Sequence, residues 1–122
     1  MSTLARLEDE WHDEVPVAKL HGEVDASNVK EIGDRLRALL SNRSVAMVVD
    51  LSQTTYLDSA GINLLFSLGD ELRWRQQTLR LVVGETTPIA RMLAITGLDR
   101  AQPIHHTVAD ALAAAGRSSG AQ

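Results

Sequence analysis

The sequence predicts a single-domain α/β protein in which helices pack against a mixed β-sheet of four to five strands. The chain has 122 residues, about the size of one domain. Short apolar, β-branched runs alternate along it with segments whose apolar residues recur at helical spacing. The predicted element order is ββαβαβαβα. Strands separated by helices imply parallel neighbours joined by right-handed crossovers, whereas the first two strands are expected to pair antiparallel.

The N-terminal quarter of the chain predicts two strands. Polar and apolar residues alternate over 15–21, and more weakly over 4–11, as they do in half-buried strands. Pro16 has no amide hydrogen to donate, so it moves the start of the second strand toward an edge or a bulge. The alternation ends at residues 22–27, where we expect a loop.

The middle of the chain predicts a helix, a central strand and a second helix. Apolar residues recur at helical spacing over 29–41, with Asn28 as the expected N-cap. The continuous apolar run 45–51 is typical of a strand that is covered on both faces. Residues 62–74 have the length of a helix and a broad apolar face.

A third strand–helix unit follows. Residues 79–83 form another short apolar run and predict a strand. The pair Thr87-Pro88 predicts the start of a helix, because proline loses no hydrogen bond at the first helical position. Gly97 stands where a left-handed cap would end that helix.

The C-terminal part predicts a short edge strand over 103–106 and an alanine-rich helix that is capped by Thr107 and ends near Ala115. The last seven residues are small and polar. We therefore expect the domain to span 1–115 and a disordered tail to span 116–122.

Composition excludes several classes of protein. Twelve Lys and Arg against 16 Asp and Glu give a formal net charge of −4, which argues against the basic surface that nucleic acids require. The absence of cysteine excludes disulfides, thiolate metal sites and a cysteine nucleophile. Residues 1–10 are charged, and no apolar run approaches the roughly 20 residues of a membrane span. We expect a cytoplasmic protein with no signal peptide, no membrane contact and no nucleic-acid partner.

Ser59 is the main candidate for chemistry. It lies in Asp58-Ser59-Ala60-Gly61, after the predicted central strand and at the start of a helix. The pattern resembles a nucleophile elbow, but Leu57 stands where that motif needs glycine. No histidine in the sequence has a recognisable triad setting. A serine hydrolase remains an alternative that the sequence disfavours.

Modification explains Ser59 better than hydrolysis does. Unpaired N–H groups and a partial positive charge at a helix N-terminus can accept a phosphate. A purely structural role stays open for two residues. Ser59 could be a plain N-cap, and Asp25 could be a turn residue or a helix-capping residue. Tyr56 is expected on a loop, where it either faces a partner or packs.

Metal and nucleotide sites have little support. His105 and His106 are adjacent, so on a strand they point to opposite faces and cannot share an ion. The glycines do not form a phosphate-binding loop with the required lysine. We expect no metal and no cofactor.

Three segments in this order resemble the STAS-domain family, specifically its anti-sigma factor antagonists. They are Gly22-Glu23-Val24-Asp25; Val48-Val49-Asp50-Leu51 followed by Tyr56-Leu57-Asp58-Ser59-Ala60-Gly61-Ile62; and Pro88-Ile89-Ala90-Arg91-Met92-Leu93 followed by Gly97-Leu98. The resemblance covers residues 13–115 and implies a STAS-like fold.

The resemblance also implies a regulatory protein and not an enzyme. Such proteins bind an anti-sigma factor that is also a serine kinase, and so release the sigma factor. The kinase phosphorylates the loop serine and ends the interaction, and a metal-dependent serine/threonine phosphatase restores it. By position, Ser59 is the implied phosphoacceptor. The implied partner-binding residues are Asp25, Tyr56, Asp58, Ala60 and Gly61.

Ala60 departs from the family pattern, which usually has serine or threonine there. The change excludes a second phosphoacceptor at this position. A second interpretation keeps the fold but has no phosphoswitch, with the chain as a STAS subunit that scaffolds a transporter or a signalling assembly.

Overall fold

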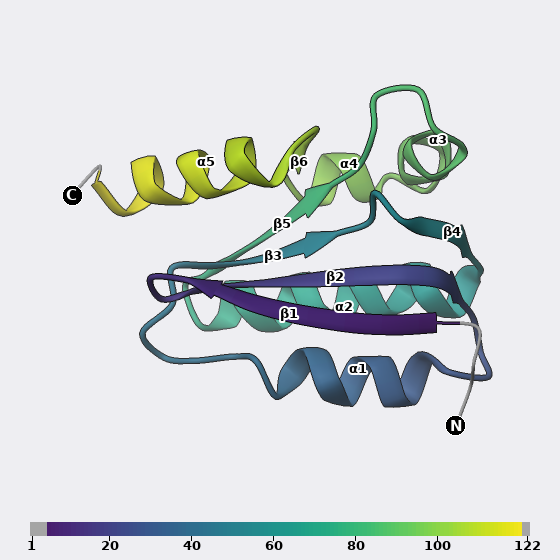
Figure 1. Cartoon of the computed structure of the whole chain (residues 1–122), viewed down its shortest axis with the longest axis horizontal. Helices are drawn as coiled ribbons and strands as arrows, with labels where there is room; N and C mark the ends of the chain where they lie inside the picture. Colours follow the sequence, from purple (N-terminus) through teal and green to yellow (C-terminus); the bar gives the residue numbers. More distant parts are fainter. Residues whose placement is uncertain (1–4, 121–122) are drawn as a thin grey trace.

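A six-stranded mixed sheet forms the centre of the structure (Figure 1). The computed structural model describes residues 5–120. The strands are β1 (Ala5–His12), β2 (Val15–Val24), β3 (Ala46–Asp50), β4 (Thr54–Leu57), β5 (Thr78–Val82) and β6 (Ile104–His105). Their order is β1-β2-β3-β5-β6, and β4 pairs with β2 beside this path. β1 and β2 are antiparallel, and the pairs β2–β3, β3–β5 and β5–β6 are parallel, as the sequence predicted. The parallel pair β2–β4 was not predicted.

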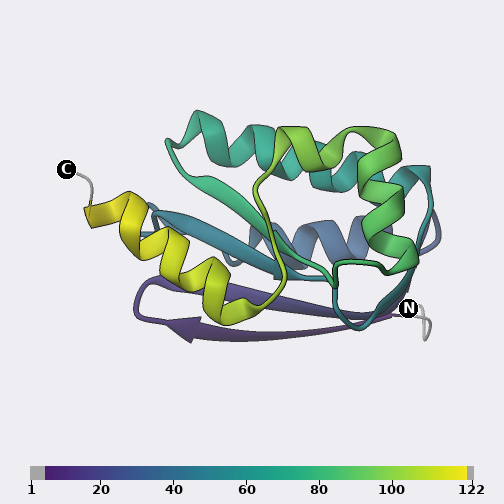
Figure 2. The same cartoon turned by 90° about the horizontal axis from the view of Figure 1, so that it is seen from above.

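Helices cover both faces of the sheet (Figure 1; Figure 2). On one face, α1 (Val29–Arg37), α2 (Ser59–Trp74), α3 (Pro88–Thr96) and the short α4 (Leu98–Ala101) enclose the larger apolar core. On the other, α5 (Val108–Gly120) packs on β3 and β5 around a smaller cluster. No helix within residues 5–120 is long and apolar enough to span a bilayer.

β3 is buried along its whole length, which confirms the prediction of a central strand covered on both faces. Met47 and Val49 belong to the larger core, whereas Val48 belongs to the cluster beneath α5. This division follows from the alternation of side chains along a strand.

Several predicted boundaries differ from the structure. The expected sheet of four to five strands lacked β4, and no helix was expected at α4. The first helix ends at Arg37 rather than at residue 41, and the second begins at Ser59 rather than at residue 62. α5 continues to Gly120, so the predicted tail is helical over 116–120, and residues 121–122 lie outside the described part of the chain.

β2 and β4 together determine where the site lies. They run parallel, with Glu23 opposite Tyr56 and Val24 opposite Leu57, so their carboxyl ends lie side by side. The predicted loop over 22–27 is thus strand as far as Val24. Gly22 has a φ of 91°, which a glycine adopts without strain, and the register shifts directly after it.

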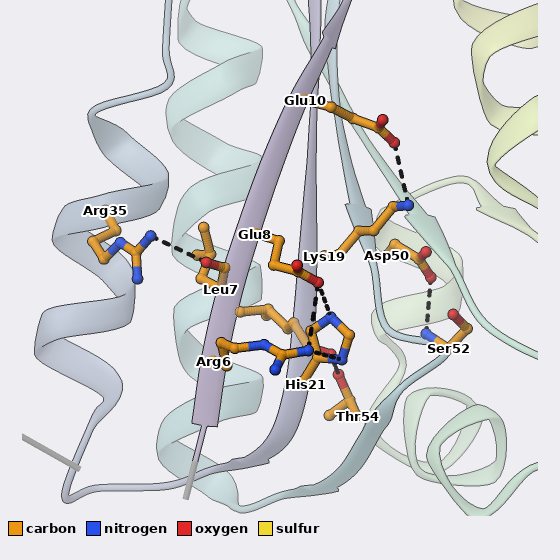
Figure 3. Close-up of polar contacts among 11 residues, drawn as sticks. Arg6, Leu7, Glu8, Glu10, Lys19, His21, Arg35, Asp50, Ser52 and Thr54 are labelled. Carbon is orange, nitrogen blue, oxygen red and sulfur yellow. Dashed lines mark hydrogen bonds and ion pairs between the residues drawn. The ribbon is translucent and has the colours of Figure 1, made fainter. Parts of the chain in front are cut away.

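Polar contacts hold β4 against β2 (Figure 3). The buried hydroxyl of Thr54 donates to the carbonyl of Leu20 at 2.8 Å. The carboxylate of Asp50 accepts from the amide of Ser52 at 2.9 Å and shapes the turn that leads from β3 into β4. These contacts hold β4 in place, and β4 leads directly into Asp58 and the exposed Ser59.

Candidate functional site

Asp58 is the N-cap of α2. Its backbone is extended, and its Oδ1 accepts from the amide of Gly61 at 3.0 Å. Ser59 is therefore the first residue of the helix, and the interpretation of Ser59 as a plain N-cap is wrong. With the cap made by Asp58, the hydroxyl of Ser59 has no capping role. Its residue is exposed to solvent.

The next two residues differ in exposure. Ala60 is half-buried and Gly61 is buried. A Cβ on Gly61 would lie 3.1 Å from the carbonyl oxygen of Val24 and 3.1 Å from a methyl of Leu57. Gly61 thus allows the first turn of α2 to approach the strand ends closely, and it supports the surface without offering a side chain to a partner.

Tyr56 lies on β4 and not on a loop, which corrects the prediction from sequence. About 45% of the residue is exposed. A groove of about 700 Å³ runs from Tyr56 and Ser59 across the first turns of α2 to α3. Its lining residues are Tyr56, Leu57, Asp58, Ser59, Ile62, Asn63, Phe66, Met92 and Thr96.

Six lining residues are not among the predicted site residues: Leu57, Ile62, Asn63, Phe66, Met92 and Thr96. Of these, Met92 and Thr96 are the two that lie outside the segment around Ser59. They follow Ser59 by more than 30 residues and come from α3. No local pattern points to them, since only the packing of α3 beside α2 brings them to the groove. The predicted helix start and stop themselves are confirmed, with Thr87 capping the amide of Ala90 and Gly97 left-handed.

Asp25 lies in the turn directly after β2 and accepts hydrogen bonds from its own turn. Its Oδ1 accepts from the amide of Ser27 at 2.9 Å and from the hydroxyl of Ser27 at 2.5 Å. These bonds stabilise the carboxylate, and the hydroxyl of Ser27 is the main cause that holds the pKa of Asp25 below its usual value. Asp25 therefore carries a full negative charge at neutral pH.

Asp58 also joins the turn after β2 to the start of α2. Its Oδ2 accepts from the amide of Ala26 at 3.1 Å, while its own amide donates to the carbonyl of Val24 at 3.2 Å. Two acidic residues, Asp25 and Asp58, are thereby fixed next to each other at the ends of neighbouring strands. The structure brings all six predicted site residues into this one region.

Asn28 occupies the predicted N-cap position of α1, but its side chain makes no capping bond. Its Oδ1 accepts from the amide of Asp25 at 3.0 Å, and its Nδ2 donates to the carbonyl of Glu23 at 2.9 Å. The side chain points back into the turn because the turn itself has backbone groups to satisfy.

The groove contains no imidazole that could activate Ser59, since none of its nine lining residues is a histidine. His105 contacts Arg80, whereas His106 bonds the carbonyl of Val83, so the adjacent pair does not converge. Within residues 5–120, no three His, Asp or Glu side chains gather as a metal site would require. The site offers the hydroxyl of Ser59 and the carboxylate of Asp58 on a groove, with the carboxylate of Asp25 in the neighbouring turn.

Comparisons with known proteins agree with this fold. The family model described as "Mlab, STAS domain" matches residues 7–116. The chain is 26% identical over 102 residues to the anti-sigma-F factor antagonist RsfB of Mycobacterium tuberculosis, a match that covers 83% of this chain and 81% of that protein. It is 29% identical over 77 residues to an anti-sigma-B factor antagonist of Listeria monocytogenes, covering 63% and 67%.

A solved structure shows the same arrangement of elements. The crystal structure of an anti-sigma factor antagonist from Mycobacterium paratuberculosis superposes with a TM-score of 0.81 and 28% sequence identity. The match covers 91% of this chain and 93% of that one. The family model, which spans nine-tenths of the sequence, and this agreement in fold lead to one conclusion: the chain belongs to the STAS-domain family.

Proposed function

We propose that the protein is an anti-sigma factor antagonist whose binding surface surrounds Ser59. In its unphosphorylated form it binds an anti-sigma factor in the cytoplasm and so releases a sigma factor. The names of its relatives in M. tuberculosis and L. monocytogenes support this role. The observation that carries the proposal is an exposed Ser59 at the first position of α2, directly after Asp58, whose carboxylate caps the helix.

The position of Ser59 suits a phosphate. Amides in the first turn of a helix lack partners within the helix, and the helix dipole places partial positive charge there. A phosphate on Ser59 can therefore be accommodated without rearranging α2. Because Ala60 has no hydroxyl, the modification would be confined to one residue of the turn.

Charge explains how phosphorylation would end binding. A phosphoserine adds about −1.5 to −2 charges at neutral pH. At a separation of about 6 Å and an effective dielectric constant of about 20, one added charge beside one carboxylate costs roughly 2–3 kcal/mol, which salt and water reduce at an exposed site. About 1.4 kcal/mol changes affinity tenfold. This repulsion is screened by water in the free protein and grows when a partner covers the site, where the phosphate must also lose its own hydration. A partner surface shaped for a neutral hydroxyl would therefore lose about one to three decades of affinity.

The chemistry of phosphoryl transfer is assigned to the partner. Ser59 contributes the acceptor oxygen, and Asp58 or Asp25 can orient the hydroxyl. The anti-sigma factor, as a serine kinase, supplies the nucleotide and the general base. A serine/threonine phosphatase would return Ser59 to its active form. On this account the protein is a substrate and a binding module and not an enzyme.

Intact mass measurement tests the modification. The protein is incubated with ATP and each of a panel of purified anti-sigma factor kinases. We expect the mass of one phosphate to be added in the wild type and lost in Ser59→Ala. Ser67→Ala is the matched control, since Ser67 is exposed on the same helix, and it should be modified like the wild type. Phosphate that persists in Ser59→Ala would contradict the assignment, and wild type that none of the kinases modifies would favour a scaffolding role.

A further inference from the structure

Asn28 holds the turn between β2 and α1 from the inside. Only 4% of the residue is exposed. Its carboxamide accepts from the amide of Asp25 and donates to the carbonyl of Glu23. One of these backbone groups is a donor and the other is an acceptor. A single short side chain can bond both only if it carries an acceptor and a donor, as the carboxamide of asparagine does.

The turn that Asn28 holds carries Asp25 and also bonds the residue that precedes Ser59. The carboxylate of Asp25 lies at its start, and the amide of Ala26 donates to Oδ2 of Asp58. The other oxygen of Asp58 caps α2 at Gly61. Hydrogen bonds therefore run from Asn28 through the turn to the residue that precedes Ser59.

We propose that Asn28 is the positioning residue of the switch: it holds the turn that carries Asp25 and that places the Ala26 amide on the carboxylate of Asp58, next to Ser59. This inference rests on the proposed function and adds a residue to it. Asn28 would act through the turn and would not touch the partner, because it is buried.

Because the turn is exposed, the loss of its order can be distinguished from a loss of packing in the core. Ala26 and Ser27 are on the surface and Asp25 is only partly covered. Water can replace the bonds that Asn28→Ala removes from Asp25 and Glu23, so the core would keep its packing while the turn loosens. The loss should therefore appear locally at the switch.

Nuclear magnetic resonance on the unbound protein tests the positioning directly. In Asn28→Ala, we expect the amide of Ala26 to exchange with solvent about tenfold faster, since one net hydrogen bond corresponds to about that factor. The carboxyl of Asp25 should titrate at a higher pH than in the wild type, because its bonds from Ser27 depend on the same turn. The amide of Leu68, in the core, should exchange at the wild-type rate.

Two further variants make the test specific. Asn42→Ala is the matched control, because Asn42 is exposed before β3, at the opposite end of the parallel strands. It should change neither the Ala26 exchange nor the Asp25 titration. Asn28→Asp is the second variant, for use if Asn28→Ala does not fold. It keeps the acceptor for the amide of Asp25 but faces the carbonyl of Glu23 with a second acceptor, so it should also make the Ala26 amide exchange faster. Wild-type behaviour of both Asn28 variants would overturn the proposal.

Phosphorylation kinetics connect the turn to the switch. With the kinase that modifies the wild type, kcat/KM for Ser59 should fall about tenfold in Asn28→Ala and stay unchanged in Asn42→Ala. A loosened turn with unchanged kcat/KM would refute the positioning role and leave the proposed function intact. If no kinase modifies the wild type, the proposed function fails, while the resonance experiments still decide whether Asn28 orders the turn.

Discussion

Asp58 shows how much a single residue does at this site. One carboxylate oxygen caps α2 at Gly61 and the other ties down the turn that carries Asp25 through the amide of Ala26. The same residue stands directly before Ser59. Because Asp58 makes the cap, a modification of Ser59 would remove no capping hydrogen bond from α2.

Replacing Asp58 should therefore cost stability as well as binding. We expect Asp58→Ala to lower the free energy of unfolding by about 1–2 kcal/mol, as the loss of an N-cap does. Asp58→Asn keeps an acceptor for Gly61 and should lose much less. Urea denaturation followed by circular dichroism measures both variants. An Asp58→Ala protein as stable as the wild type would show that the cap contributes nothing.

The sequence located these residues but not all of their contacts. Apolar spacing predicted the helix only from residue 62, and Ser59 was expected near its start because it follows the predicted central strand; the structure begins the helix at Ser59 with Asp58 as its cap. The sequence also assigned the N-cap of α1 to Asn28. It could not foresee that this side chain would turn back to Asp25 and Glu23, since the geometry of the turn depends on how β2 ends.

At the scale of elements, β4 is the piece that the sequence did not reveal. It has four residues, it follows a turn, and only the two at its ends are buried. Its residues Thr54, Thr55 and Tyr56 suit a strand, but a run this short does not predict one, and pairing with β2, which is distant in sequence, makes it a strand. The short α4 was missed for a similar reason, because four residues after Gly97 carry no helical periodicity.

The anchoring of β4 can be tested at Thr54. Thr54→Val keeps the shape of the side chain and removes the hydroxyl that donates to Leu20. We expect a loss of about 1 kcal/mol in the free energy of unfolding and faster exchange of the β4 amides. Thr55→Val is the matched control on the same strand, since Thr55 is exposed, and it should behave like the wild type. Equal stability of the two variants would argue against this anchor.

At the scale of the whole molecule, the parallel arrangement of β2 and β4 gathers the site at one end. Both strands deliver their next residue, Asp25 or Asp58, to the same edge. α3 then adds Met92 and Thr96 to the far wall of the groove. The sequence predicted the order of most elements, but this wall depends on long-range packing that no local pattern encodes.

The central claim is that one charge at Ser59 controls binding. The most direct measurement is the affinity for the anti-sigma factor kinase that is found to phosphorylate Ser59 by intact mass measurement. Calorimetry determines this affinity for the wild type, Ser59→Ala and Ser59→Asp. We expect wild type and Ser59→Ala to bind alike and Ser59→Asp to bind at least about tenfold more weakly, because the added charge must be covered by a partner surface that fits a neutral side chain. Equal affinities for all three proteins would contradict the account.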